Sequence, residues 1–155
     1  AMALAALDPE AYRPFNMLIA DNRDAYWICN TGSTENIELE KLQPGLSIMT
    51  SHRINDPKCP RTMAYLPRFK RAPIPEPDRN DWTAWQMLLA SGPQDASTNS
   101  GPALCVVTDA GFNTICSTLI ALPSVAKMEQ ITNDLGYFLF ASGPPNKAPF
   151  KSVSE

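Results

Sequence analysis

Apolar residues in the first third of the chain fall in short runs separated by turn residues. Two runs of strand length, 15–20 and 25–29, flank the polar residues 21–24, so we predict a β-hairpin. Residues 37–42 alternate apolar and acidic side chains, and residues 46–50 alternate again after a Pro-Gly turn. Because alternation with a period of two is typical of half-buried strands, we predict a second pair of strands there.

Helical spacing of apolar residues predicts helices in the middle of the chain. The clearest helix is capped by Asn80 or Asp81 and ends at Gly92-Pro93, with apolar positions at Trp82, Trp85, Leu88 and Leu89. A shorter helix over 61–69 is predicted to be interrupted at Pro67, and an extended Pro-rich link follows it. At the start, residues 1–7 favour a helix, and Asp8-Pro9-Glu10 begins a new helical turn.

The last third adds strands and a tail. Three apolar runs, 103–107, 115–122 and 137–140, are predicted strands, and residues 143–155 are a predicted Pro-rich tail that runs over the surface. Strands in hairpins with two or three helices indicate an α+β fold, with helices packed on one face of an antiparallel sheet. We expect residues 1–155 to form one domain.

Composition narrows the class of protein. The chain is 44% apolar and 19% charged, which is typical of a globular protein, and its net charge is −3. Basic residues are scattered apart from Arg68, Lys70 and Arg71, so we expect no nucleic-acid partner. No apolar run approaches the roughly 20 residues that span a bilayer, and no secretory signal pattern is present. We therefore expect a protein of the cytoplasm without a transmembrane segment.

The four cysteines indicate reduced thiols rather than a disulfide scaffold. They are Cys29, Cys59, Cys105 and Cys116, and they form no Cys-x-x-Cys pair. Their spacing to His52, the single histidine, matches no compact zinc pattern. We expect no metal site.

Several segments, read in order, resemble one known family. They are the Phe-Asn-Met strand at 15–21, a strand that ends in Asn30, the block Leu42-Gln43-Pro44-Gly45-Leu46-Ser47 followed by Ser51, a Pro-rich helix start, and Asn113-Thr114-Ile115-Cys116-Ser117-Thr118. In this order they resemble the bacterial-like members of the transport and Golgi organisation protein 2 family, also called NRDE after an Asn-Arg-Asp-Glu signature. The resemblance covers residues 15–123, about three quarters of the chain.

The resemblance implies a fold and a missing part. Family members begin with Met-Cys and are related in fold to the N-terminal-nucleophile hydrolases, which place two sheets between helices in an αββα sandwich. This chain is similar to the C-terminal portion of such a domain, without its N-terminal strands. The sheet edge left by the missing strands would favour self-association.

The residues argue against catalysis by this chain. An N-terminal-nucleophile hydrolase needs an N-terminal Cys, Ser or Thr, and Ala1 offers no nucleophile. Ser51 and His52 are adjacent, so on a strand their side chains would point to opposite faces, and we identify no carboxylate that would orient the imidazole. We expect no catalytic residue in this chain and leave the complete protein open.

Ligand binding is the alternative, and six residues are candidates for it. The family has been linked to haem trafficking, and Cys59-Pro60, seven residues after His52, is similar to short motifs that bind haem through a thiolate. The competing interpretation is a Pro-rich helix entry. Polar residues at strand positions either line a pocket or satisfy the backbone locally. The candidates are His52, Cys59, Asn30, Ser51, Thr114 and Ser117.

A stripe of apolar residues at helical spacing has two interpretations, because it forms either a groove for a flat ligand or part of the core. The residues of this stripe are Trp82, Trp85, Met87 and Leu88. The leading hypothesis is non-catalytic binding or trafficking of an amphipathic small molecule, with haem as a candidate cargo and no other cofactor. The alternatives are an amidohydrolase whose nucleophile-bearing half is absent, and a structural or interaction domain.

Overall fold

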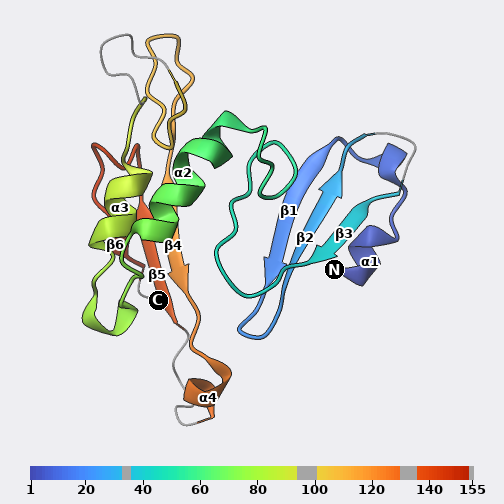
Figure 1. The fold of residues 1–155 in the computed structure, drawn as a ribbon, viewed down its shortest axis with the longest axis horizontal. Coiled ribbons are helices and arrows are strands. Elements are labelled where there is room, and N and C mark those ends of the chain that lie inside the picture. The colour runs from blue at the N-terminus through green and yellow to red at the C-terminus, as the bar shows by residue number, and fades with distance from the viewer. Residues whose placement is uncertain (33–35, 94–100, 130–135, 154–155) are drawn as a thin grey trace.

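The computed structural model describes residues 1–32, 36–93, 101–129 and 136–153. Within these ranges the chain has a mixed α/β fold with two three-stranded antiparallel sheets, in the orders β1-β2-β3 and β4-β5-β6 (Figure 1). The first half contributes α1 (Met2–Ala5), the 3-10 turn η1 (Pro9–Ala11), β1 (Phe15–Ala20), β2 (Ala25–Asn30) and β3 (Glu38–Lys41). The second half contributes α2 (Pro60–Arg71), η2 (Pro77–Arg79), α3 (Thr83–Leu89), β4 (Ser117–Ala121), α4 (Val125–Met128), β5 (Tyr137–Ala141) and β6 (Lys151–Ser152).

The predicted β-hairpin is confirmed, and a side chain stabilises its turn. β1 and β2 pair from Phe15 with Asn30 to Ala20 with Ala25. Between them, the Asp21 carboxylate accepts hydrogen bonds from the backbone N–H of Arg23 at 2.7 Å and of Asp24 at 2.8 Å. These backbone donors hold the pKa of Asp21 below its usual value. Asp21 therefore stabilises its own turn through backbone hydrogen bonds, which is the usual role of aspartate in a turn.

The two faces of the first sheet are covered by different segments. Across an antiparallel ladder paired residues share a face, so Ile28 and Asn30 lie on one face and Trp27 and Cys29 on the other. Asn30 donates to the carbonyl of Pro9 at 3.0 Å, which holds the N-terminal segment against its face. Trp27 is fully buried on the opposite face. Both sides of β2 are therefore buried from Trp27 to Asn30.

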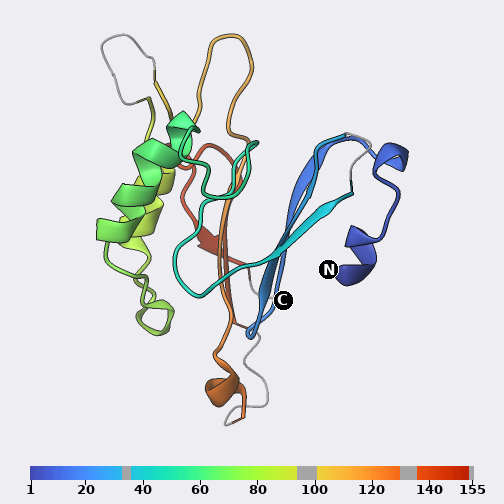
Figure 2. The same cartoon turned by 45° about the vertical axis from the view of Figure 1, so that its right-hand side comes forward.

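Helix α3 covers one face of the second sheet. Leu119 of β4 is paired with Leu139 of β5, and both are buried against Trp82. Trp85 packs against the same cluster and meets the ring of Phe69 edge-on at 5.1 Å, which joins α2 to α3. Figure 2 shows α2 and α3 on the side of this sheet that faces away from the first sheet. Trp82 is thus part of the core, whereas Met87 is exposed, and Trp82, Trp85 and Met87 also line a shallow groove at the surface of α3.

Helix α2 is longer than predicted. Its buried side carries Thr62, Tyr65, Leu66 and Phe69, at i, i+3, i+4 and i+7. The predicted interruption at Pro67 is wrong, because the helix continues to Arg71. Proline removes only the bond to the carbonyl of Met63, and that residue lies on the exposed side, where water replaces the missing donor.

Two predicted strands are wrong, and the predicted tail is partly a strand. Residues 46–50 form no strand, because the Asn55 side chain and backbone bind Ile48 and fold the segment back on itself. Residues 103–107 also lack a ladder, although Ala103 and Cys105 are buried. Near the C-terminus, Lys151 pairs with Phe140 and adds β6 to the second sheet. In the first two segments, alternating burial occurs without strand pairing.

None of the helices in the described ranges is both long and apolar enough for a bilayer crossing.

The packing of α3 predicts unequal effects of two substitutions. Trp82 is 4% exposed, so Trp82→Ala should lower the free energy of unfolding by about 3–5 kcal/mol. Met87, on the same helix, is 70% exposed, and Met87→Ala should change stability by less than about 0.5 kcal/mol. Urea unfolding followed by circular dichroism measures both. Equal losses would contradict the assignment of Trp82 to the core.

Candidate functional site

A cleft of about 620 Å³ lies where β1 and β2 meet the loop after residue 49. Its volume is within the range of small-molecule sites. It has polar and apolar lining residues, which are Pro14, Phe15, Asn16, Cys29, Asn30, Thr31, Thr50, Ser51, His52 and Arg53. Three of the predicted ligand-binding residues, Asn30, Ser51 and His52, therefore come together in one cleft.

The amide of Asn16 holds the loop wall of the cleft in place. Asn16 Oδ1 accepts a hydrogen bond from the indole N–H of Trp27 at 3.1 Å, and Asn16 Nδ2 donates to the carbonyl of Thr50 at 3.2 Å. The carbonyl of His52 lies 3.5 Å from the same nitrogen. One side chain on β1 thus positions both Thr50 and His52.

Arg53 closes the wall next to this contact. Its guanidinium lies over the ring of Trp27, 5.1 Å from the centroid, and forms an ion pair with Glu38 on β3. A cation above an indole face is attracted by the ring quadrupole. The loop is therefore fastened to the sheet by a charge and by the Asn16 amide, independently of each other.

His52 has the oriented, accessible imidazole of the cleft. Its side chain is 51% exposed, and its Nδ1 lies 3.4 Å from Asp56 Oδ2. Asp56 is itself fixed, because its other oxygen accepts the backbone N–H of Lys58 at 2.8 Å. The expectation that His52 lacks a carboxylate partner is wrong. The His-x-x-x-Asp spacing in the sequence is the signal that would have identified Asp56.

Cys59 lies behind the cleft at the start of α2, where it is the N-cap residue. The residue is buried, and its sulfur is 3.5 Å from the Thr50 hydroxyl. Burial alone would raise the pKa of this thiol, but the Thr50 hydroxyl and the groups of Thr62 and Arg61 in the first turn lower it to about 7. The Thr62 hydroxyl is buried without another hydrogen-bond partner among the described residues, and it is one of the groups that lower this pKa.

Thr50 connects Cys59 to the cleft through its hydroxyl. Thr50 Oγ1 accepts a hydrogen bond from the backbone N–H of His52 at 3.1 Å. Because this bond uses a lone pair, the hydroxyl proton remains available to the sulfur of Cys59. Thr50, Arg53 and Asp56 are functional-site residues that sequence reasoning missed, since a loop without regular structure brings them together.

The remaining predicted residues have local bonding roles. Asn30 Nδ2 donates to the N-terminal segment, and Asn30 Oδ1 accepts the backbone N–H of Gly32 at 2.9 Å. Thr114 Oγ1 accepts the backbone N–H of Val106 at 2.9 Å, and Ser117 opens β4 opposite Ala141. Ser117 therefore belongs to the second sheet and Thr114 to the irregular segment that precedes β4, and neither residue lines the cleft.

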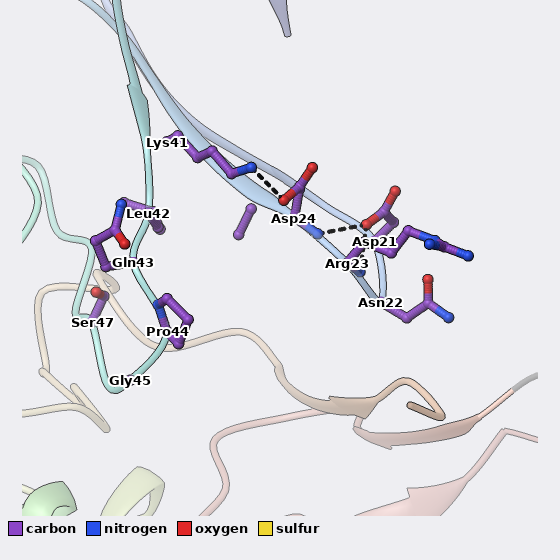
Figure 3. Close-up of a pocket in the computed structure, with 11 residues that line it drawn as sticks. Asp21, Asn22, Arg23, Asp24, Lys41, Leu42, Gln43, Pro44, Gly45 and Ser47 are labelled. Carbon is purple, nitrogen blue, oxygen red and sulfur yellow. Dashed lines mark hydrogen bonds and ion pairs between the residues drawn. The ribbon is translucent and has the colours of Figure 1, made fainter. Parts of the chain in front are cut away.

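A second hollow, of about 530 Å³, surrounds the turn between β1 and β2 (Figure 3). Three of its charged groups are already engaged: Lys41 contacts Asp24 at 2.6 Å, and Asp21 accepts the backbone bonds of its own turn. Within the described ranges, no group of three His, Cys, Asp or Glu side chains is arranged to hold a metal ion. The cleft with His52 is the better ligand site, because its imidazole retains an open nitrogen.

Comparisons with known proteins leave the site to be judged on its geometry. No family model matches the chain, and no curated protein or solved structure gives a significant match.

The pKa of Cys59 predicts a pH dependence of stability. The pKa of the Cys59 thiol is lowered to about 7 in the folded chain, from an ordinary value of 9.0. Between these two pH values the unfolded chain therefore binds more protons than the folded chain. Folding stability should therefore rise from pH 7 to pH 9, and this contribution should be lost as the pH falls through 7. Cys59→Ala should flatten that rise in thermal melts, whereas Cys105→Ala should keep it. A Cys59→Ala protein with an unchanged rise would contradict the assignment.

Proposed function

We propose that the cleft binds an amphipathic small molecule without catalysis, and that haem is the cargo, with His52 as the iron ligand. The observation that carries the proposal is the contact between His52 Nδ1 and the Asp56 carboxylate, 3.4 Å apart. Histidines that bind metals almost always give their other ring N–H to such a carboxylate, which fixes the ring orientation. No described residue is bonded to Nε2, and this nitrogen is our proposed donor to iron.

The lining of the cleft suits a molecule with apolar and anionic parts. Pro14 and Phe15 supply apolar surface, while Ser51 and Arg53 supply polar groups on the loop side. The Arg53 side chain is 59% exposed even though it is paired with Glu38, so it is accessible to the carboxylates of a haem. These lining groups support an amphipathic ligand, and His52 would be the residue that holds its iron.

Cys59 is the weaker candidate for the iron ligand. It is 4% exposed, and its sulfur contacts the Thr50 hydroxyl and the first turn of α2. A ligand would have to displace these donors to reach the thiolate. We therefore propose that Cys59 stabilises the loop from behind the cleft rather than binding iron.

We further propose that the chain belongs to the transport and Golgi organisation protein 2 family and forms part of an αββα sandwich. The pattern of exposure supports this: Ile120 and Phe138, a cross-strand pair on the face opposite α3, are exposed large apolar residues. Apolar residues on both faces are typical of a sheet that is covered on both sides. Free thiols at all four cysteines support a reducing compartment such as the cytoplasm.

A haem titration followed by absorbance tests the function. The unmodified chain should give a saturable shift of the Soret band, and His52→Ala should abolish it. Asp56→Asn, which keeps an oxygen for the Lys58 N–H, should weaken binding by about 10- to 100-fold. Cys59→Ala should keep the shift, because the thiol is not the proposed iron ligand, and Cys105→Ala, whose sulfur bonds to Asn146 away from the cleft, is the matched control that should bind as tightly as the unmodified chain. A flat titration, or an unchanged shift in His52→Ala, would remove haem bound through His52 as the function.

A further inference from the structure

The helix α2 region concentrates positive charge in an acidic protein. Residues 58–71 contain five of the thirteen basic side chains and none of the sixteen acidic ones. The rest of the chain therefore carries eight basic side chains against sixteen acidic ones. Such asymmetry within a chain favours contact with an anionic partner.

Helix stability explains only part of this cluster. Arg68, Lys70 and Arg71 lie in the last turn of α2, where the helix dipole favours cations. Lys58 and Arg61 lie at the other end of the helix, where the same dipole disfavours them. A role in stabilising the helix therefore cannot account for all five charges.

These charges are not neutralised by the described part of the protein. None of the ion pairs among described residues includes Lys58, Arg61, Lys70 or Arg71, and all four residues are exposed. Arg68 is half-buried, with its guanidinium 5.2 Å from the centre of the Tyr65 ring. Four exposed basic side chains at the two ends of α2 are thus free to pair with a partner, and two of them, Lys70 and Arg71, lie at its C-terminal end.

Exposed apolar side chains lie beside the charges. Met63 is 64% exposed and shares the outward side of α2 with Pro67, Lys70 and Arg71, at i, i+4, i+7 and i+8. Ile74 and Met87 are 84% and 70% exposed, and both line a shallow groove of about 250 Å³ at α3. In Figure 2, α2 and α3 lie side by side in the outer layer of the molecule.

We propose that the outward side of α2, with Ile74 and Met87 beside it, docks on a bilayer that contains anionic phospholipid. The lysine and arginine side chains pair with headgroup phosphates and carboxylates, while Met63, Ile74 and Met87 enter the boundary with the acyl chains. The apolar residues favour a bilayer over a nucleic acid, because a phosphate backbone offers them no apolar surface. The surface is separate from the cleft, so it does not depend on the proposed ligand.

Co-sedimentation with vesicles tests the proposal. The chain should bind vesicles of phosphatidylserine in phosphatidylcholine, should not bind phosphatidylcholine alone, and should bind more weakly at high salt. Lys70→Gln with Arg71→Gln should weaken partition by about 10- to 30-fold. Met63→Ser should weaken it by about 5-fold with no change in charge. The positions are exposed, so circular dichroism should show unchanged folding.

A second double variant distinguishes the effect of the α2 surface from the effect of the overall net charge. Arg13→Gln with Arg23→Gln removes the same charge from exposed positions at the start of β1 and in its turn, and it should leave vesicle binding unchanged. Equal losses in both pairs would overturn the proposal, as would no binding to anionic vesicles. Binding to an oligonucleotide but not to vesicles, lost with Lys70 and Arg71, would also overturn it. His52→Ala should bind vesicles normally, so failure here and failure of haem binding are distinguishable.

Discussion

The amide of Asn16 is the contact on which the cleft depends. Its oxygen satisfies the indole N–H of the fully buried Trp27, and its nitrogen holds the carbonyl of Thr50. A buried N–H left without a partner costs about 1–3 kcal/mol, so the amide cannot be exchanged for an apolar group without a penalty in the core. From Thr50 the contacts continue to the sulfur of Cys59 and into the first turn of α2. The strand, the loop and the helix are therefore positioned by one continuous set of bonds.

The predictable parts of the fold were those set by neighbouring residues. The hairpin of β1 and β2 and the helix around Trp85 follow from turn residues and periodicity within about a dozen positions. Residues 46–50 have the period of a strand, yet the Asn55 side chain takes the N–H of Ile48 that a ladder would need. Asn55 lies outside residues 46–50, so the alternation within that segment could not reveal this hydrogen bond. The error at Pro67 has a similar cause, because only the exposure of Met63 shows that the lost bond faces water.

The candidate site was predicted only in part, again because contacts between distant segments decide which residues line it. Asn30, Ser51 and His52 do line one cleft, but the sequence did not indicate that Ser117 lies in another sheet and Thr114 in the segment that leads into it. Polar residues within strands mostly bond to backbone groups, as Asn30 does to Pro9. His52 differs because its loop holds the ring through Asp56 and leaves half of the side chain in solvent. Accessibility, which no residue pattern reports, separates it from the buried candidates Asn30 and Cys59.

The hydroxyl of Tyr65 joins two points of the chain that are not neighbours in the sequence. It lies 3.3 Å from the carbonyls of both Gly92 and Pro102, and it accepts a hydrogen bond from Ser91 at 3.1 Å. Two points ten residues apart are thereby joined at one buried ring, so the ends of the intervening segment are already held together. The entropy of closing a loop grows only slowly with its length once its ends are fixed. A change in the number of residues between Gly92 and Pro102 should therefore alter the stability of the protein only slightly.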